Sequence, residues 1–150
     1  MLAQAEIQER MRRFPERCWA AGLKVTHQRT AIFNVLAATD RHPSPEEVYE
    51  AVRPELPSIS LATVYKVLDL FHRQGFLRKV STEQQVARYD AFTEPHHHLV
   101  CDRCGRIEDV QVELTGGDLA APQRSDFAIS HYDIIFHGVC GACRRSDAAD

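Results

Sequence analysis

Four cysteines in two identically spaced pairs are the strongest constraint on how this chain folds. Cys101 and Cys104 form one C-x2-C pair, and after 35 intervening residues Cys140 and Cys143 form the other. Such a pattern is typical of a closed tetrahedral zinc site, in which each pair lies on a tight turn and the two turns converge. A redox-active pair and four unrelated buried thiols are the alternatives. The matched spacing favours structural Zn2+ over both.

The surroundings of the cysteines also favour metal chemistry. No apolar run approaches the roughly 20 residues that a membrane-spanning helix needs, and the start, MLAQAEIQERMRRF, lacks the apolar core of a signal peptide. We therefore expect a cytoplasmic protein with no membrane partner, in which cysteines bind metal or do redox chemistry and do not form structural disulfides. Cys18, alone beside Trp19, is expected to be a small buried hydrophobic residue.

Charge and ligand-forming residues are divided unevenly along the chain. Residues 1–90 hold 13 Lys and Arg against 11 Asp and Glu, whereas residues 91–150 hold 5 against 10. Four of the five cysteines and five of the eight histidines lie in the second part. We expect a weakly basic domain with a hinge over residues 1–90, joined to an acidic, ligand-rich domain over residues 91–150. Halves this small often need a metal or a partner subunit.

The first domain contains strong helix signals. Apolar residues recur at helical spacing in RTAIFNVLAA, residues 29–38. In HPSPEEVYEAV, Ser44 is a predicted N-cap, Pro45 takes the first helical position and Glu47 follows three residues after the cap. Two helices are therefore predicted before residue 53.

A third helical stretch and two short strands follow. SLATVYKVLDLFHRQG has a cap at Ser60 and is expected to end at Gly75. FLRKV (76–80) and VARYD (86–90) are β-prone and are separated by the polar STEQQ. Helices followed by a hairpin resemble a winged helix-turn-helix, in which residues 60–74 would enter the major groove of DNA.

Contacts with DNA are expected near the start of that helix. The candidates lie close to its N-terminus: Ser60, Thr63, Tyr65 and Lys66. Basic residues further along could hold phosphates: Arg73, Arg78 and Lys79. The alternative is that Tyr65 is a core aromatic and that the basic residues only solvate a surface. The small charge excess of residues 1–90 does not decide between them.

Three consecutive histidines precede the first cysteine pair. In a strand, His96 and His98 project from one face and His97 from the other. Carboxylates are nearby at four positions: Asp90, Glu94, Glu108 and Asp109. Two imidazoles with oxygen ligands suit Fe2+ or Mn2+, whereas the thiolate site suits Zn2+. A solvated histidine cluster is the alternative, and strand alternation alone leaves both Glu108 and Asp109 open.

Six motifs in this order resemble the ferric uptake regulator superfamily over about residues 15 to 143. They are GLKVTHQRTAIFNVL, HPSPEEVY, SLATVYKVLDLF, ARYD, PHHHLVCDRCGRIEDV and GVCGAC. The resemblance implies an α+β fold, with an N-terminal winged helix-turn-helix followed by a small α/β dimerisation domain that holds structural zinc. It further implies a homodimeric, metal-dependent transcriptional repressor, not an enzyme, whose partner is palindromic double-stranded operator DNA.

Within the superfamily, the peroxide-responsive branch is the closest resemblance. It implies one regulatory Fe2+ or Mn2+ site with five ligands: His42, Asp90, His96, His98 and Asp109. His42 and His96 match the histidines that are oxidised in that branch. A repressor of iron or manganese uptake is the alternative, because the same ligands can bind either ion. Uptake regulators usually have a glutamate at the position of Asp90, and a histidine where this chain has Tyr132.

The chain departs from the family pattern at two places. His27 stands where many relatives have proline, and paired glycines in residues 114–127 leave the usual helix of the dimerisation domain unassigned. Three further histidines have no assigned role: His97, His131 and His137.

Two other classes of function compete with a repressor. A metal-dependent oxygenase or hydrolase could use two histidines and a carboxylate, but the sequence has no signature of a substrate pocket or general base. A zinc-ribbon interaction protein would explain the cysteines alone. In such a protein, His42 and Asp90 would be dispensable.

Overall fold

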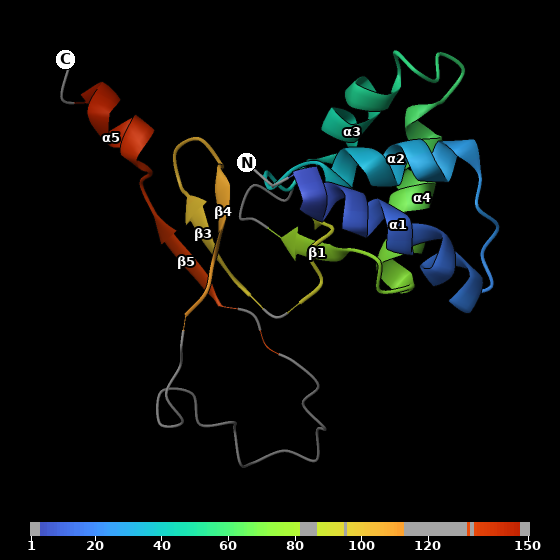
Figure 1. Cartoon of the computed structure of the whole chain (residues 1–150). Helices are drawn as coiled ribbons and strands as arrows, with labels where there is room; N and C mark the ends of the chain where they lie inside the picture. Colours follow the sequence, from blue (N-terminus) through green and yellow to red (C-terminus); the bar gives the residue numbers. More distant parts are fainter. Residues whose placement is uncertain (1–3, 82–86, 95, 113–131, 133, 148–150) are drawn as a thin grey trace, which may run out of the picture. The chain divides into compact units, whose positions relative to one another are not determined.

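The computed structural model of the chain contains two compact units, Met1–Thr93 and Glu94–Asp150. It describes residues 4–81, 87–94, 96–112, 132 and 134–147. Each unit has its own small antiparallel or mixed sheet (Figure 1). Over the described residues, no helix combines the length and apolarity needed to cross a bilayer.

The first unit is a winged helix-turn-helix. Its elements are α1 (Gln4–Ala20), α2 (His27–Ala37), α3 (Pro45–Val52), α4 (Leu61–Arg73), β1 (Arg78–Ser81) and β2 (Ala87–Asp90). The second helix packs against both α1 and α3, and α3 packs against α4 (Figure 1). The two strands pair antiparallel directly after α4. The α+β architecture is confirmed, and α1 is an additional helix before the two that the sequence predicted ahead of residue 53.

The start of α3 has the predicted capping box. The Glu47 backbone N–H donates to Ser44 Oγ at 3.3 Å, and the Ser44 N–H donates to the Glu47 carboxylate at 2.7 Å. Pro45 occupies the first turn, where a missing N–H costs nothing. The cap contributes roughly 1 kcal/mol to helix stability. It also fixes the residues that immediately precede α3, and these include His42.

The start of α4 matches the prediction, whereas its end and the hairpin differ slightly. Ser60 Oγ accepts from the Thr63 N–H at 3.1 Å, as an N-cap does. The helix stops at Arg73, and Gly75 follows with a φ of 71°, a conformation that favours glycine. Strand β1 begins two residues later than expected, because Phe76 and Leu77 are buried in the core and turn the chain toward the hairpin.

Aromatic rings form the centre of the first unit. Phe14 stacks on Phe33 with ring centroids 4.4 Å apart, and Phe71 stacks on Phe76 at 5.4 Å. The two pairs meet edge to face, a favourable arrangement for aromatic quadrupoles. Cys18 is fully buried beside them, as predicted for a small hydrophobic residue. This core holds α1, α2 and α4 together.

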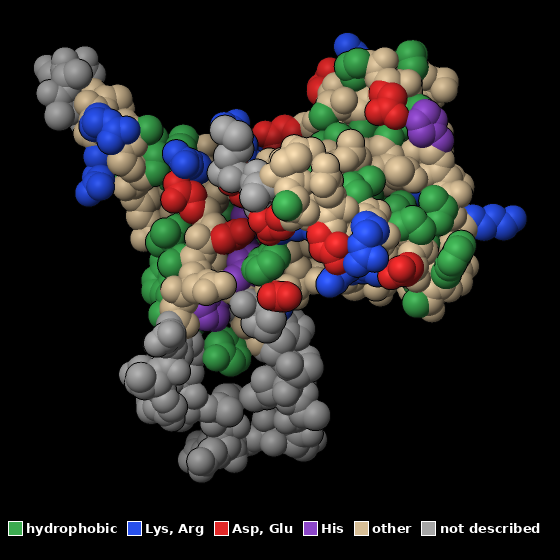
Figure 2. Space-filling view, viewed as in Figure 1, with side chains coloured by type: hydrophobic (Ala, Val, Ile, Leu, Met, Phe, Trp, Pro, Cys, Tyr) green, Lys and Arg blue, Asp and Glu red, His purple; other side chains and the backbone are tan. Residues whose placement is uncertain are grey.

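The second unit is a three-stranded sheet followed by a short helix. Strand β3 (His97–Cys101) lies between β4 (Ile107–Val110), which is antiparallel to it, and β5 (Ile135–Gly138), which is parallel. Helix α5 (Gly141–Asp147) follows β5 (Figure 1). It carries basic side chains in its last turn (Figure 2). Residues 114–127 and His131, on which the sequence left questions open, lie outside the described residues.

Candidate metal centres and the exposed face of α4

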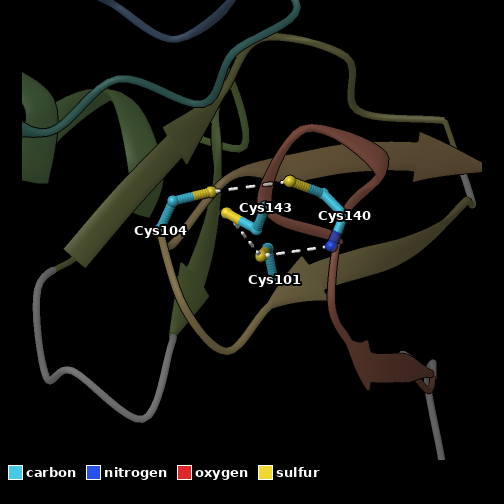
Figure 3. A group of neighbouring side chains, drawn as sticks. All are labelled: Cys101, Cys104, Cys140 and Cys143. Carbon is cyan, nitrogen blue, oxygen red and sulfur yellow. Dashed lines mark hydrogen bonds between the residues drawn. The ribbon is translucent and has the colours of Figure 1, made fainter. Parts of the chain in front are cut away.

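The two cysteine pairs of the second unit converge, as the sequence predicted (Figure 3). Cys101 ends β3 and Cys104 lies in the turn that follows, which Gly105 closes with a φ of 68° and an N–H donated to the Cys101 carbonyl. Cys140 and Cys143 lie at the start of α5, one helical turn apart. The sulfur atoms of Cys104 and Cys140 are 3.8 Å apart, and those of Cys101 and Cys143 are 4.0 Å apart.

These distances fit a tetrahedral zinc ion. Four sulfurs at 2.3 Å from a central ion lie about 3.8 Å from one another. All four ligand atoms lie within 4.8 Å of one another, and all four cysteines are unbridged thiols. The Cys140 backbone N–H donates to Cys101 Sγ at 3.3 Å, so the backbone orients a ligand sulfur. The donor set suits Zn2+ better than harder cations.

Shifted pKa values among these thiols also favour a metal cation at this site. The Cys140 backbone N–H, which donates to Cys101 Sγ, lowers the pKa of the Cys101 thiol to about 6. A hydrogen bond that the Cys143 thiol donates to Cys140 raises the pKa of Cys143 to about 12, and repulsion from the Cys101 thiolate adds to the rise. A divalent cation removes that repulsion by binding all four thiolates. The site therefore has the chemistry of a cation site.

A second group of ligand atoms lies within the second unit. His96 Nε2 and His98 Nε2 are 3.0 Å apart, and each is within 3.8 Å of an oxygen of Asp109. Both histidines are buried, and His96 Nδ1 donates to the Glu94 carbonyl at 2.8 Å when its Nε2 is the lone-pair nitrogen. A backbone carbonyl on one ring nitrogen is what orients a metal-binding imidazole. Neighbouring ligands of one ion lie about 3 to 3.5 Å apart, close to these distances.

The sheet register distinguishes Asp109 from Glu108, which strand alternation could not. Asp109 is the cross-strand partner of His98, so the two side chains share a face. Glu108 points to the other face and pairs with Arg106 at 2.8 Å. His97 also lies on the opposite face from His98, where its ring stacks on Tyr132.

Within the first unit, His42 and Asp90 form a buried pair. His42 Nε2 lies 3.8 Å from Asp90 Oδ2. The Tyr89 N–H donates to the Pro43 carbonyl at 3.1 Å, which attaches β2 to the segment before α3. His42 has a φ of 51°, the one positive φ among non-glycine residues of the described chain. Backbone strain of this kind concentrates at functional sites.

The exposed face of α4 carries the predicted DNA candidates. The buried stripe of this helix consists of Val64, Val67, Leu68 and Phe71. Tyr65 is 45% exposed, so the alternative that it is a core aromatic is wrong. Lys66 is exposed, whereas Thr63 is half-buried and its hydroxyl lies 2.9 Å from that of Ser60. The side chains of Ser60 and Thr63 therefore contribute to the N-terminal cap of α4.

The sequence did not predict two contacts that residues near this face make with α3 and the segment before it. Tyr65 Oη donates to Glu46 Oε1 at 2.5 Å, although Glu46 lies on α3. Arg88 donates to the Glu47 carboxylate at 2.6 Å and lies next to the His42 carbonyl. Acidic residues in the first turn of a helix usually stabilise the helix by a favourable interaction with its dipole. Nothing in the sequence separates Glu46 from that ordinary role.

The surface of α1 offers no uniform basic patch. Glu9 accepts hydrogen bonds from both Arg12 and Arg13, and Arg10 pairs with Glu6. Acidic and basic side chains accordingly mix on this helix (Figure 2). Charge does not mark α1 as a nucleic-acid surface.

Known proteins resemble this chain in both sequence and fold. A family profile described as "Ferric uptake regulator family" matches residues 20–143. A peroxide-responsive repressor of Staphylococcus aureus is 34% identical over 125 residues, which cover 83% of this chain and 84% of the relative.

Solved structures share the fold over nearly the whole chain. A zinc uptake regulator in complex with zinc and DNA is 27% identical, with a TM-score of 0.68 and coverage of 95% of this chain and 97% of the other. The ferric uptake regulator of Helicobacter pylori, described as having three functional metal-binding sites, is 22% identical and has a TM-score of 0.71, with coverage of 96% and 97%. The latter likeness concerns the fold alone.

Proposed function

Because this chain belongs to the ferric uptake regulator family, we propose that it is a dimeric, metal-dependent repressor that binds operator DNA and responds to peroxide. The observation that carries this proposal is the presence of two chemically different ligand sets. The four thiols suit a structural Zn2+, whereas the histidine and aspartate ligands suit an exchangeable Fe2+ or Mn2+. The relatives found by sequence are named as repressors, which favours regulation over catalysis.

We infer that the regulatory ion takes ligands from both units. His42 and Asp90 belong to the first unit, and His96, His98 and Asp109 to the second. An ion that binds all five would restrict the angle between a DNA-binding unit and a dimerising one. Palindromic half-sites require a set separation of two recognition helices, so such a restriction would favour DNA binding.

DNA binding is expected to depend on the regulatory ion. The probe is a duplex selected from a randomised library by the Mn2+-loaded protein, and fluorescence anisotropy measures its Kd with Mn2+ and after chelation. Loaded protein should bind at least about tenfold more tightly, within the range of coupling between two sites. Metal-free protein that binds as tightly as the loaded form would contradict the metal-dependent part of the proposal.

Lys66→Ala tests the DNA-binding face of α4. Removal of this exposed cation should weaken binding of the same duplex about five- to tenfold. It should also lower the slope of log Kd against log salt by about two, because each dimer carries two copies of Lys66 and would release about two fewer counterions. Arg106→Ala, which removes a positive charge from the second unit, is the control. An effect of the control as large as that of Lys66→Ala would indicate general electrostatics and not a contact made by α4.

Apolar side chains on the second sheet support self-association. Leu99 and Phe136 are register partners on neighbouring strands and are 43% and 39% exposed, and Val139 is 37% exposed. Contiguous exposed apolar groups on a protein surface commonly mark an interaction site. We assign this face to a second copy of the chain, as the family resemblance implies.

Phe136→Glu tests that assignment. A carboxylate placed in an apolar interface would be desolvated without a partner, so the dimer dissociation constant should rise at least about tenfold. Gln8→Glu adds the same charge to an exposed position of α1 and is the control. Sedimentation velocity measures both variants. A dimer that is unchanged by Phe136→Glu would place the interface elsewhere.

The peroxide response rests on the aspartate-containing ligand set and on the likeness to the Staphylococcus aureus repressor. Fe2+ held by these ligands would supply the electrons that reduce peroxide, and we propose His42 and His96, which match the histidines oxidised in the branch that the sequence resembles, as the residues that are oxidised. Loss of one imidazole ligand would weaken metal binding and release the operator. An iron- or manganese-uptake repressor remains the second candidate, since the same ligands bind either ion.

A further inference from the structure

The carboxylate of Glu46 bridges two segments of the first unit with different proposed roles. Its Oε1 accepts a hydrogen bond from Tyr65 Oη at 2.5 Å, and its Oε2 accepts one from Ser44 Oγ at 2.9 Å. Tyr65 lies on the exposed face of α4, whereas Ser44 is the N-cap of α3, two residues after His42. One side chain therefore contacts both the segment that carries a metal ligand and the helix that faces DNA.

We propose that Glu46 is a positioning residue that couples the segment containing His42 to the orientation of Tyr65 on DNA. This inference rests on the proposed function, in which His42 binds the regulatory ion and α4 binds the operator. It assigns to Glu46 a role that needs neither metal binding nor direct contact with a base.

Hydrogen bonds tie the metal-ligand end of the bridge to the start of α3. The capping box ties Ser44 to Glu47 through two hydrogen bonds, so Ser44 cannot shift without the first turn of the helix. Pro43 is held to β2 by the Tyr89 N–H, and His42 itself has a left-handed backbone. A change in the backbone of His42 on metal binding would therefore displace Ser44 and Glu46 together.

The DNA end of the bridge depends on its hydrogen bond. Tyr65 is almost half exposed, and the buried stripe of α4 leaves its ring outside the core. Core packing therefore does not fix its side-chain rotamer, whereas the bond to Glu46 fixes the hydroxyl. The same bond lowers the pKa of Glu46, so the carboxylate stays ionised and accepts strongly at neutral pH.

Charge alone would give Glu46 a different role. An exposed carboxylate next to a DNA-facing helix repels phosphates, and it does so with or without the metal. A bridging carboxylate, in contrast, changes the ratio of affinities between loaded and metal-free protein. Glutamine separates the two roles, because its amide oxygen can accept from Tyr65 Oη and its NH2 can donate to Ser44 Oγ.

The experiment measures the metal-induced gain, which is the Kd of metal-free protein divided by that of Mn2+-loaded protein for the selected duplex. Glu46→Ala should lower this gain about fivefold or more, and Glu46→Gln should retain most of it. Glu50→Ala is the matched control, because Glu50 is exposed on the same helix and contacts only the neighbouring turn through Arg53 in the described contacts. An unchanged gain in Glu46→Ala, or equal losses in the alanine and glutamine variants, would overturn the bridge.

A double-mutant cycle distinguishes loss of the contact between Glu46 and Tyr65 from a folding defect caused by Glu46→Ala. Tyr65→Phe removes the hydroxyl that Glu46 holds and leaves the α3 cap intact. In the Tyr65→Phe background, Glu46→Ala should cause little further loss of gain, since the contact is already absent. Independent, additive losses would mean that the two residues act separately, and the proposal would fail.

A readout without DNA separates this proposal from the proposed function. Protein with ring-labelled tyrosine, already zinc-loaded at the cysteine site, is titrated with further Zn2+ as a diamagnetic ion for the histidine and aspartate ligands. The Tyr65 ring signal should shift on ion binding in the wild type and in Glu50→Ala, but not in Glu46→Ala. If the Tyr65 signal shifts but the Kd for DNA does not depend on metal, the proposed metal-dependent function is wrong and the coupling through Glu46 is supported. If the ion binds and the Tyr65 signal does not move, the coupling is wrong.

Discussion

Cys101→Ser is expected to abolish zinc binding and to unfold the second unit. Among the described residues of that unit, the buried hydrophobic side chains are only Val100, Cys101 and Ile107, whereas the first unit has a large aromatic core. By themselves, the three strands and the short helix that the structure describes there bury too little apolar surface for stability. Zinc binding supplies on the order of 10 kcal/mol in small zinc domains, which is as large as the stability of a whole domain.

Metal analysis and thermal unfolding measure the effect. Wild-type protein should retain about one zinc ion per chain after gel filtration with a mild chelator. The serine variant should retain none, and it should lose the unfolding transition of the second unit together with dimerisation. Cys18→Ala is the control, because this thiol is buried in the first unit, away from the other cysteines in sequence. Reduced wild-type protein that is folded and dimeric without zinc would rule out the structural role.

The sequence predicted local features well wherever one physical signal was sufficient. The cap residues Ser44 and Ser60 begin their helices, since side-chain oxygens at these positions satisfy N–H groups that the helix leaves free. The paired cysteines converge because metal-site spacing constrains both turns. Cys18 is buried, as expected for a lone cysteine that behaves as a small hydrophobic residue.

Contacts between residues far apart in the sequence could not be predicted, because local sequence patterns do not determine which elements pair or in which register. The register between β3 and β4 places Asp109, not Glu108, beside His98, and a shift of one residue would have reversed that outcome. The bond between Glu46 and Tyr65 joins residues 19 positions apart on different helices. The start of β1 also shifted, because burial of Phe76 and Leu77 outweighed their β propensity.

With Fe2+ bound, a low dose of hydrogen peroxide is expected to release the selected duplex and to add one oxygen to His42 or His96. Fe2+ at this site would reduce peroxide beside its three imidazole ligands, and the family resemblance singles out His42 and His96 among them. With Mn2+ bound, the same dose should cause neither change, because manganese does not readily support this reaction. Anisotropy follows the DNA, and peptide mass spectrometry locates the oxygen.

The chain contains its own controls for this experiment. His27 and His137 are exposed and lie outside the proposed ligand set, so oxygen on them would indicate peroxide damage in bulk solution. Zinc-bound thiolates should resist a low dose, and oxidation confined to the four ligand cysteines would instead indicate a thiol switch.

Asp90→Glu tests the ligand set directly, since uptake regulators usually carry glutamate there. It should preserve metal-dependent DNA binding while it lowers the yield of oxidised histidine. Wild-type protein that keeps its DNA and its unmodified histidines in the presence of Fe2+ and peroxide would leave metal availability as the signal, and an uptake repressor as the function.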